Sequence, residues 1–137
     1  MTNQQHQLRW LLLAALLAIY HLYIQNPLEK RALAAAFPHA GSWLHRPRCA
    51  SCVGMPSAHA EAAALVAVLL VVRAGLPWWL GVAAVVAVAW ERVLVKQHTW
   101  LQVGVGALLG AVYGIGYTSA LFPTMVVVLV SRIMFNY

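Results

Sequence analysis

The chain has 137 residues, of which 63% are hydrophobic and only 9% are charged. Soluble domains usually carry about a quarter charged residues, so this chain has too few charges to cover the surface of a soluble globular monomer. Intrinsic disorder is excluded as well, because disordered chains have low hydrophobicity. The length indicates one domain covering residues 1–137, and the composition indicates an integral membrane protein.

The formal net charge is +6, from nine Lys and Arg against three Asp and Glu. In a soluble protein this excess would suggest nucleic acid as a partner. Here the basic residues lie mostly in short polar gaps between apolar runs. That placement favours the membrane bilayer and a phosphorylated lipid as partners over nucleic acid. The sequence leaves the oligomeric state open.

The first apolar run extends from Leu8 to Ile24 and is close to the length of a membrane span. We expect a retained span rather than a cleaved signal peptide, because the small-residue sites at 34–36 lie far beyond the run. His21, near the end of the run, is expected at the membrane–water boundary rather than in a proton relay. Residues 28–44 contain three adjacent charges and two helix breakers, which predicts an interfacial helix followed by a loop, with a short tilted span as the alternative.

The rest of the chain contains four apolar runs, at residues 57–72, 78–90, 99–117 and 121–133. Their composition shows no strand-like alternation of polar and apolar residues, so we expect helices rather than a barrel. The predicted fold class is all-α, a small bundle of about five transmembrane helices. Gly106, Gly110 and Gly114 recur every four residues on one helix face, which predicts close helix packing inside the bundle rather than a homodimer contact.

Two histidine-bearing segments are expected on the same side of the membrane, because two spans separate them. In the first, Ser57 is suited to cap the helix that follows, and the backbone N–H groups from Ala58 onward would lack helical acceptors. Such a helix start attracts phosphate, and His59 lies in its first turn. Arg46 and Arg48 lie upstream, and a guanidinium group binds phosphate through two parallel hydrogen bonds.

The second segment extends from Glu91 to Gln102 and contains Arg92, Lys96 and His98. Gln102 follows His98 by four residues and so lies on the same helix face. Its side-chain carbonyl can accept a hydrogen bond from Nδ1 of His98, which leaves Nε2 free to attack an electrophile. Each residue also has a simpler interpretation, as a capping histidine or as basic residues marking a cytoplasmic turn. The complete set on one membrane side favours a phosphate site.

Cys49 and Cys52 form a lone Cys-x2-Cys pair. A structural zinc site usually needs a second pair at a defined spacing, so zinc is disfavoured. A local disulfide is expected only if the loop faces an oxidising compartment, and two unpaired thiols are the default expectation.

The order of these motifs resembles a known family. The chain is similar to the three signatures of the type-2 phosphatidic acid phosphatase superfamily at Arg46-Pro47, at Pro56-Ser57-Ala58-His59 and at Arg92-x5-His98. Residues 54–60 and the segment His98-Thr99-Trp100-x-Gln102-Val103 resemble its dolichyl-diphosphatase branch most closely. The resemblance covers residues 46–110.

The resemblance implies that His98 is the nucleophile and forms a phosphohistidine, and that His59 is the general acid. It implies further that the phosphate is held by Arg46, Ser57, the amides from Ala58 onward and Arg92. No metal or other cofactor is required in this family. Where the superfamily has a lysine, this chain has His39. The auxiliary candidates for the role of that lysine are His39, Lys30, Arg48 and Lys96.

The function implied is that of a metal-independent membrane phosphatase. It would hydrolyse dolichyl diphosphate to dolichyl phosphate and inorganic phosphate. The alternatives are a phosphatase of another polyprenyl or glycerolipid phosphate, and a non-catalytic protein that binds lipid phosphate. In a eukaryote the resemblance implies the endoplasmic reticulum membrane with a luminal site, whereas counting basic residues would place the site in the cytosol.

Overall fold

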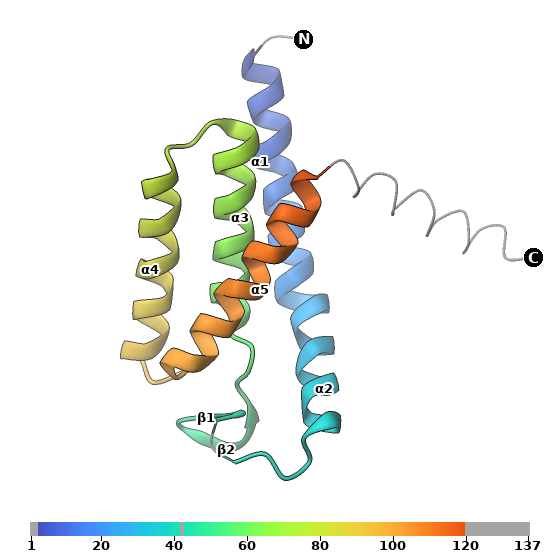
Figure 1. Ribbon diagram of the computed structural model, residues 1–137, viewed down its shortest axis with the longest axis vertical. Helices are drawn as coiled ribbons and strands as arrows, with labels where there is room; N and C mark the ends of the chain where they lie inside the picture. The colour runs from blue at the N-terminus through green and yellow to red at the C-terminus, as the bar shows by residue number, and fades with distance from the viewer. Residues whose placement is uncertain (1–2, 42, 120–137) are drawn as a thin grey trace, which may run out of the picture.

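The N-terminal helical segment runs without a break from residue 3 to residue 36 in the computed structural model, which describes residues 3–41 and 43–119 (Figure 1). Helix α1 (Asn3–Tyr20) continues through a π-helical turn, η1 (His21–Gln25), into α2 (Asn26–Ala36). Pro27 directly follows the π-helical turn, in which the N–H of Asn26 donates to the carbonyl oxygen of His21. The changed hydrogen-bond register of such a turn lets the helix continue through a residue that has no N–H group. The helix and the loop expected within 28–44 are present, but this helix continues directly from the first run instead of being separate from it.

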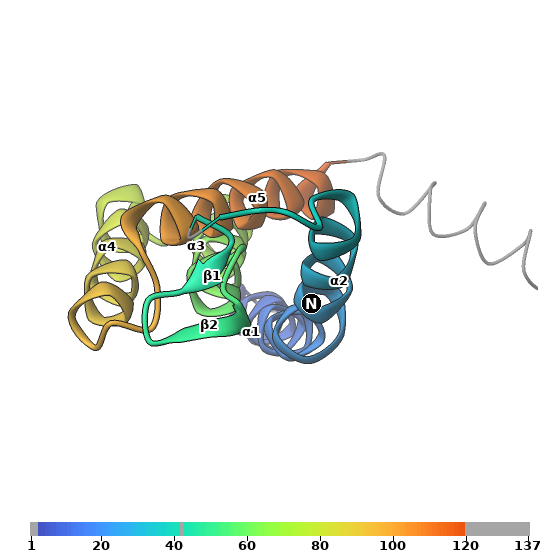
Figure 2. The ribbon, with the colours of Figure 1, turned by 90° about the horizontal axis from the view of Figure 1, so that it is seen from below.

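Three further helices follow the sequence runs closely: α3 (Ala58–Ala74), α4 (Trp78–Leu94) and α5 (Trp100–Thr118). Gly75 ends α3 in a left-handed conformation with φ of 75°, a backbone conformation that favours glycine. Helix α3 is central, with α1, α4 and α5 packed around it (Figures 1 and 2). The all-α prediction is confirmed.

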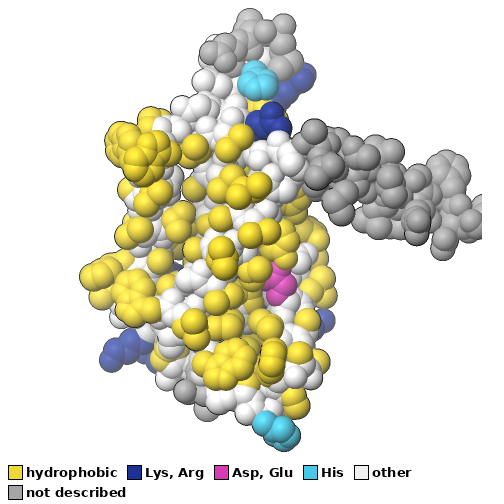
Figure 3. All heavy atoms as spheres, viewed as in Figure 1, with side chains coloured by type: hydrophobic (Ala, Val, Ile, Leu, Met, Phe, Trp, Pro, Cys, Tyr) yellow, Lys and Arg dark blue, Asp and Glu magenta, His cyan; other side chains and the backbone are white. Residues whose placement is uncertain are grey.

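Two helical stretches within the described residues are long and apolar enough to cross a membrane, Gln4–Ala36 and Trp100–Thr118. Helices α3 and α4 have 17 residues each. Five spans are therefore not supported, and the predicted run at 121–133 lies outside the described residues. Hydrophobic side chains cover most of the middle of the face in Figure 3, and the Lys and Arg side chains visible there lie toward its upper and lower parts.

A small hairpin interrupts the helical architecture where a plain loop was expected. Strand β1 (His45–Arg46) pairs antiparallel with β2 (Cys49–Val53) below the N-terminus of α3 (Figure 1). Cys49 and Cys52 form a disulfide within β2. The expectation of two unpaired thiols is therefore wrong.

Helices α3 and α5 cross at the predicted glycine face. A Cβ atom on Gly106 would lie 2.5 Å from the carbonyl oxygen of Ser57, and one on Gly110 would overlap the carbonyl oxygen of Glu61. Gly114 faces Val68 and Leu65 in the same way. The prediction of glycine packing inside the bundle is confirmed, and this close approach fixes the start of α5 against the start of α3.

We expect Gly110→Ala to lower the free energy of unfolding by about 1–3 kcal/mol, because the added methyl group has no space beside the α3 backbone. Gly104→Ala is the matched control: no atom of another segment lies within 4 Å of the Cβ that alanine would add, so that change should be neutral or stabilise the helix by up to about 1 kcal/mol. Unfolding of both variants in detergent micelles measures the difference. Equal stability of the two variants would show that α3 and α5 do not pack through their backbones here.

Candidate active site

The side chain of Gln102 joins three segments of the chain at the lower end of the bundle. It is fully buried, and its Nε2 donates to the carbonyl oxygens of Trp43 at 3.0 Å and His45 at 2.7 Å. Its Oε1 accepts from the backbone N–H of Thr99 at 3.2 Å, as part of a capping box that begins α5. The hairpin and the start of α5 are therefore tied together through one amide group.

The same Oε1 atom lies 3.3 Å from Nδ1 of His98, the hydrogen bond that the four-residue spacing predicts. The orientation of the amide is fixed because its nitrogen faces two carbonyl groups. Its oxygen can only accept, so Nδ1 of His98 carries the proton. With its proton on Nδ1, the neutral ring carries its lone pair on Nε2, as a nucleophile requires. A hydrogen bond with the backbone of Gly54 also acts on the ring.

Gly54 makes the close approach of the hairpin possible. A Cβ atom at this position would lie 2.7 Å from Oε1 of Gln102 and 3.0 Å from Cγ of Arg46. A larger residue would displace either side chain. Gly54 therefore belongs to the site through its lack of a side chain, a role that the sequence motif alone did not reveal.

The start of α3 lies directly against this unit. The backbone N–H of Ser57 donates to the carbonyl oxygen of Gln102 at 3.1 Å. Ser57 occupies the N-cap position, as predicted, but its hydroxyl group makes no capping hydrogen bond. Its Oγ is buried and has no hydrogen-bond partner, and the N–H groups of the first turn, from Ala58 onward, have no acceptors within the helix.

Arg46 supplies a second buried donor without a partner. Its Nη1 donates to Oε1 of Gln97 at 3.4 Å, whereas its Nε has no partner. Unpaired buried polar atoms are rare and call for an explanation. Two of the four such atoms found among the described residues belong to Arg46 and Ser57, both of which were predicted to bind phosphate.

His59 is exposed in the first turn of α3. The positive charges of Arg92, Lys30 and Arg46 all act on it electrostatically, and those of Lys30 and Arg46 also act on His98. Cations from α4, α2 and β1 therefore converge on the two histidines. The predicted grouping of both motifs at one end of the bundle is present.

Lys30 was one of the candidates for the role of the superfamily's lysine. It lies in the middle of α2 and interacts electrostatically with Arg46, Glu61 and Glu29. The expectation of an interfacial helix gave Lys30 no position relative to the two histidines. Continuation of the helix through residue 36 brings Lys30 alongside the site instead.

The guanidinium group of Arg92 is already paired. Its Nη2 lies 2.6 Å from Oε1 of Glu91, and its Nε pairs with the other carboxylate oxygen. The Glu91 side chain is 49% exposed, so this is a surface pair that a bound anion could replace.

Three auxiliary candidates have exposed side chains. His39 is exposed and lines a separate small pocket with Phe37 and Trp43. Arg48 is exposed in the turn of the hairpin, and Lys96 is exposed in the turn between α4 and α5. None of the three contributes to the electrostatic environment of His59 or His98.

A buried polar network lies behind the site, between α1, α2, α3 and α5. Nδ1 of His21 lies 2.5 Å from Oε1 of Glu61, and its Nε2 lies 3.1 Å from the hydroxyl group of Tyr117. Asn26 donates to Oε2 of Glu61 at 2.8 Å and to the carbonyl oxygen of Pro56 at 3.3 Å. His21 is therefore fully buried inside the bundle, with Glu61 and Tyr117 as partners.

Comparison with protein-family models, characterised proteins and solved structures gives no match for this chain. Across residues 3–41 and 43–119, no group of three or more His, Cys, Asp or Glu side chains could hold a metal ion.

Burial lowers the pKa of His98 to about 4, and the charges of Lys30 and Arg46 act in the same direction. We expect His98 to stay neutral at pH 5.5, where an ordinary histidine is mostly protonated. Nitrogen-15 NMR of histidine-labelled protein in micelles measures this, with His98→Gln assigning the signal. Because only the unfolded chain takes up a proton at His98 between about pH 6.5 and 4, its contribution to stability falls as the pH falls through that window. A midpoint at or above 6.5 would contradict the burial of this ring.

Proposed function

We propose that this protein is a membrane phosphatase that hydrolyses an isoprenoid lipid diphosphate, such as dolichyl diphosphate, through a phosphohistidine at His98. One observation carries the proposal. Gln102 holds the ring of His98 through Nδ1, and two buried donors without partners, Arg46 Nε and Ser57 Oγ, belong to segments bonded to the same unit. A bound phosphate oxygen would provide the acceptors that these donors lack.

In the first step, Nε2 of His98 attacks the terminal phosphorus atom. The bond from phosphorus to the bridging oxygen breaks, and His59 donates a proton to that oxygen as the lipid monophosphate leaves. In the second step, His59 takes a proton from water as the water oxygen attacks the phosphohistidine. Inorganic phosphate is released, and both histidines return to their starting states.

Positive charge would stabilise the transferred phosphoryl group, because its oxygens carry most of the charge in the transition state. Arg46 and Lys30 supply two such charges from β1 and α2. Arg92 would supply a third by exchanging the Glu91 carboxylate for phosphate. Gln102 would hold the His98 ring as it becomes positively charged, through an uncharged acceptor.

We place the protein in the membrane as a multi-pass chain, with the endoplasmic reticulum as the proposed compartment in a eukaryote. The apolar surface and the two long apolar stretches support membrane association. The Cys49–Cys52 disulfide lies in the same hairpin as Arg46. Disulfides persist in oxidising compartments, which supports a luminal rather than a cytosolic site.

The alternatives concern the substrate and the catalysis. Another polyprenyl phosphate or a glycerolipid phosphate would use the same phosphate contacts. The pairing of Arg92 with Glu91 favours a non-catalytic lipid-phosphate-binding protein, because one predicted phosphate ligand already has an anion.

Substitutions of the two histidines should affect activity differently when the leaving group of the substrate is varied. We expect His98→Ala to abolish phosphate release and covalent labelling with every substrate. His59→Ala should lose activity with the lipid diphosphate but retain it with an aryl phosphate, whose leaving group needs no proton. Assays of purified protein in micelles containing EDTA measure both rates.

His39→Ala is the matched control, since His39 is exposed and lies in a different pocket; it should be as active as the parent protein. Equal losses for both site variants on both substrates would refute the assigned roles. Tight binding of the lipid phosphate without any turnover would support the non-catalytic alternative.

We expect Lys30→Met to weaken inhibition by vanadate roughly 10–100-fold, the loss for one hydrogen bond to a charged group. Arg31→Met removes the adjacent but exposed charge and should leave inhibition unchanged. Lys30→Arg should restore part of the affinity, because the positive charge is retained. Equal effects of the two methionine variants would mean that Lys30 does not face the phosphate.

A further inference from the structure

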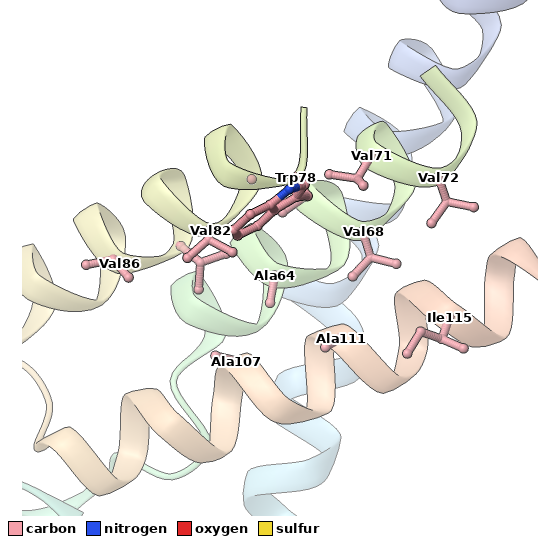
Figure 4. Close-up of a pocket in the computed structure, with 13 residues that line it drawn as sticks. Ala64, Val68, Val71, Val72, Trp78, Val82, Val86, Ala107, Ala111 and Ile115 are labelled. Carbon is pink, nitrogen blue, oxygen red and sulfur yellow. The ribbon is translucent and has the colours of Figure 1, made fainter. Parts of the chain in front are cut away.

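We infer that the apolar groove between α3, α4 and α5 binds the hydrocarbon tail of the lipid phosphate whose headgroup is hydrolysed at His98. The inference rests on the proposed function for the identity of the headgroup, and on an independent surface for the tail. The groove has a volume of about 480 Å³ and is lined by side chains from all three helices (Figure 4).

The lining is chemically uniform. Small residues, including Ala64, Gly81 and Ala107, give the groove its width, and valines such as Val68 and Val82 form its walls. Valine side chains have few rotamers, so these walls are stiff. Such a surface offers no partner for ordered water, and it matches an apolar chain rather than a polar or charged ligand.

The groove and the phosphate ligands lie on the same faces of two helices. Ser57 and Ala64 are seven residues apart at the start of α3, and residues at that spacing lie on one helix face, two turns apart. Val85 and Arg92 have the same relation at the end of α4. When the phosphate of a lipid contacts Ser57 and Arg92, the hydrocarbon tail of that lipid would therefore lie in the groove.

The helices that line the groove also converge on the site. Helices α4 and α5 meet at their connecting turn, which carries His98, and diverge from there along α3 (Figure 1). The groove continues along α3 to Val72 and along α5 to Ile115, toward the opposite end of the bundle. Arg92 therefore lies near one end of this path, Arg73 follows Val72 at the other end, and apolar side chains line its length. The phosphate ligands Ser57 and Arg92 mark the end at which the headgroup would lie.

A photoreactive polyprenyl monophosphate, with a diazirine near the middle of its tail, tests this placement in lipid nanodiscs. After irradiation, we expect labelled peptides from the groove faces of α3, α4 and α5. The polyprenol with the same diazirine but no phosphate should label these faces roughly tenfold less, as expected if the phosphate contacts provide about 1.4 kcal/mol of binding. Labelling spread over all lipid-facing positions, equal labelling by the alcohol, or no groove labelling would overturn the inference.

Ala107→Phe should fill the groove and lower both groove labelling and kcat/KM for the long-chain diphosphate roughly tenfold, the loss expected when about two methylene groups are no longer buried. Its kcat/KM for a short aryl phosphate should not change. Val112→Phe, on the exposed face of α5, is the matched control and should behave like the parent protein. Phosphate-dependent labelling of the groove without turnover would refute the proposed phosphatase activity but support the tail site. Turnover without labelling of the groove would support the phosphatase activity but refute the tail site.

Discussion

The Gln102 amide is the interaction on which the arrangement of the site depends. Its nitrogen holds the backbone of the hairpin at Trp43 and His45, and its oxygen holds both the start of α5 and the ring of His98. An amide can do this because it combines two donors with an acceptor. A carboxylate at the same position would retain the acceptors but lose both bonds to the hairpin. The orientation of His98 and the position of Arg46 are therefore set together.

Behind this unit, the bundle buries His21, Asn26 and Glu61, three polar side chains that hydrogen-bond one another. Glu61 links His21 of η1 with Asn26 of α2, and Asn26 also holds the carbonyl oxygen of Pro56 just before α3. Each bond joins the N-terminal helical segment to the element that carries Ser57 and His59. The same segment carries Lys30, so the network also determines where that cation lies relative to the histidines.

Much of the site could be predicted from the sequence because its residues are close neighbours along helices. The spacing of His98 and Gln102 and the glycine face of α5 depend on helical periodicity alone, and both appear as expected. The position of His21 could not be predicted, because its partner Glu61 is 40 residues away and apolar surroundings suggested the membrane boundary. The first helix continues through Pro27, which depends on tertiary contacts rather than on local pattern. The pairing of Cys49 with Cys52 depends likewise on the compartment that the hairpin faces.

The contact between Gly54 and Gln102 has a consequence for how this sequence can change over evolutionary time. The space that a side chain would need at position 54 is filled by the amide of Gln102. Replacement of glycine alone would push the amide away from His98, whereas replacement of Gln102 by a shorter residue would free that space while releasing the hairpin. A substitution at one of these positions alone would disturb the site, so we expect substitutions at 54 and 102 to arise as a pair. We therefore expect the two motifs to be conserved together, although they are distant from each other in the chain.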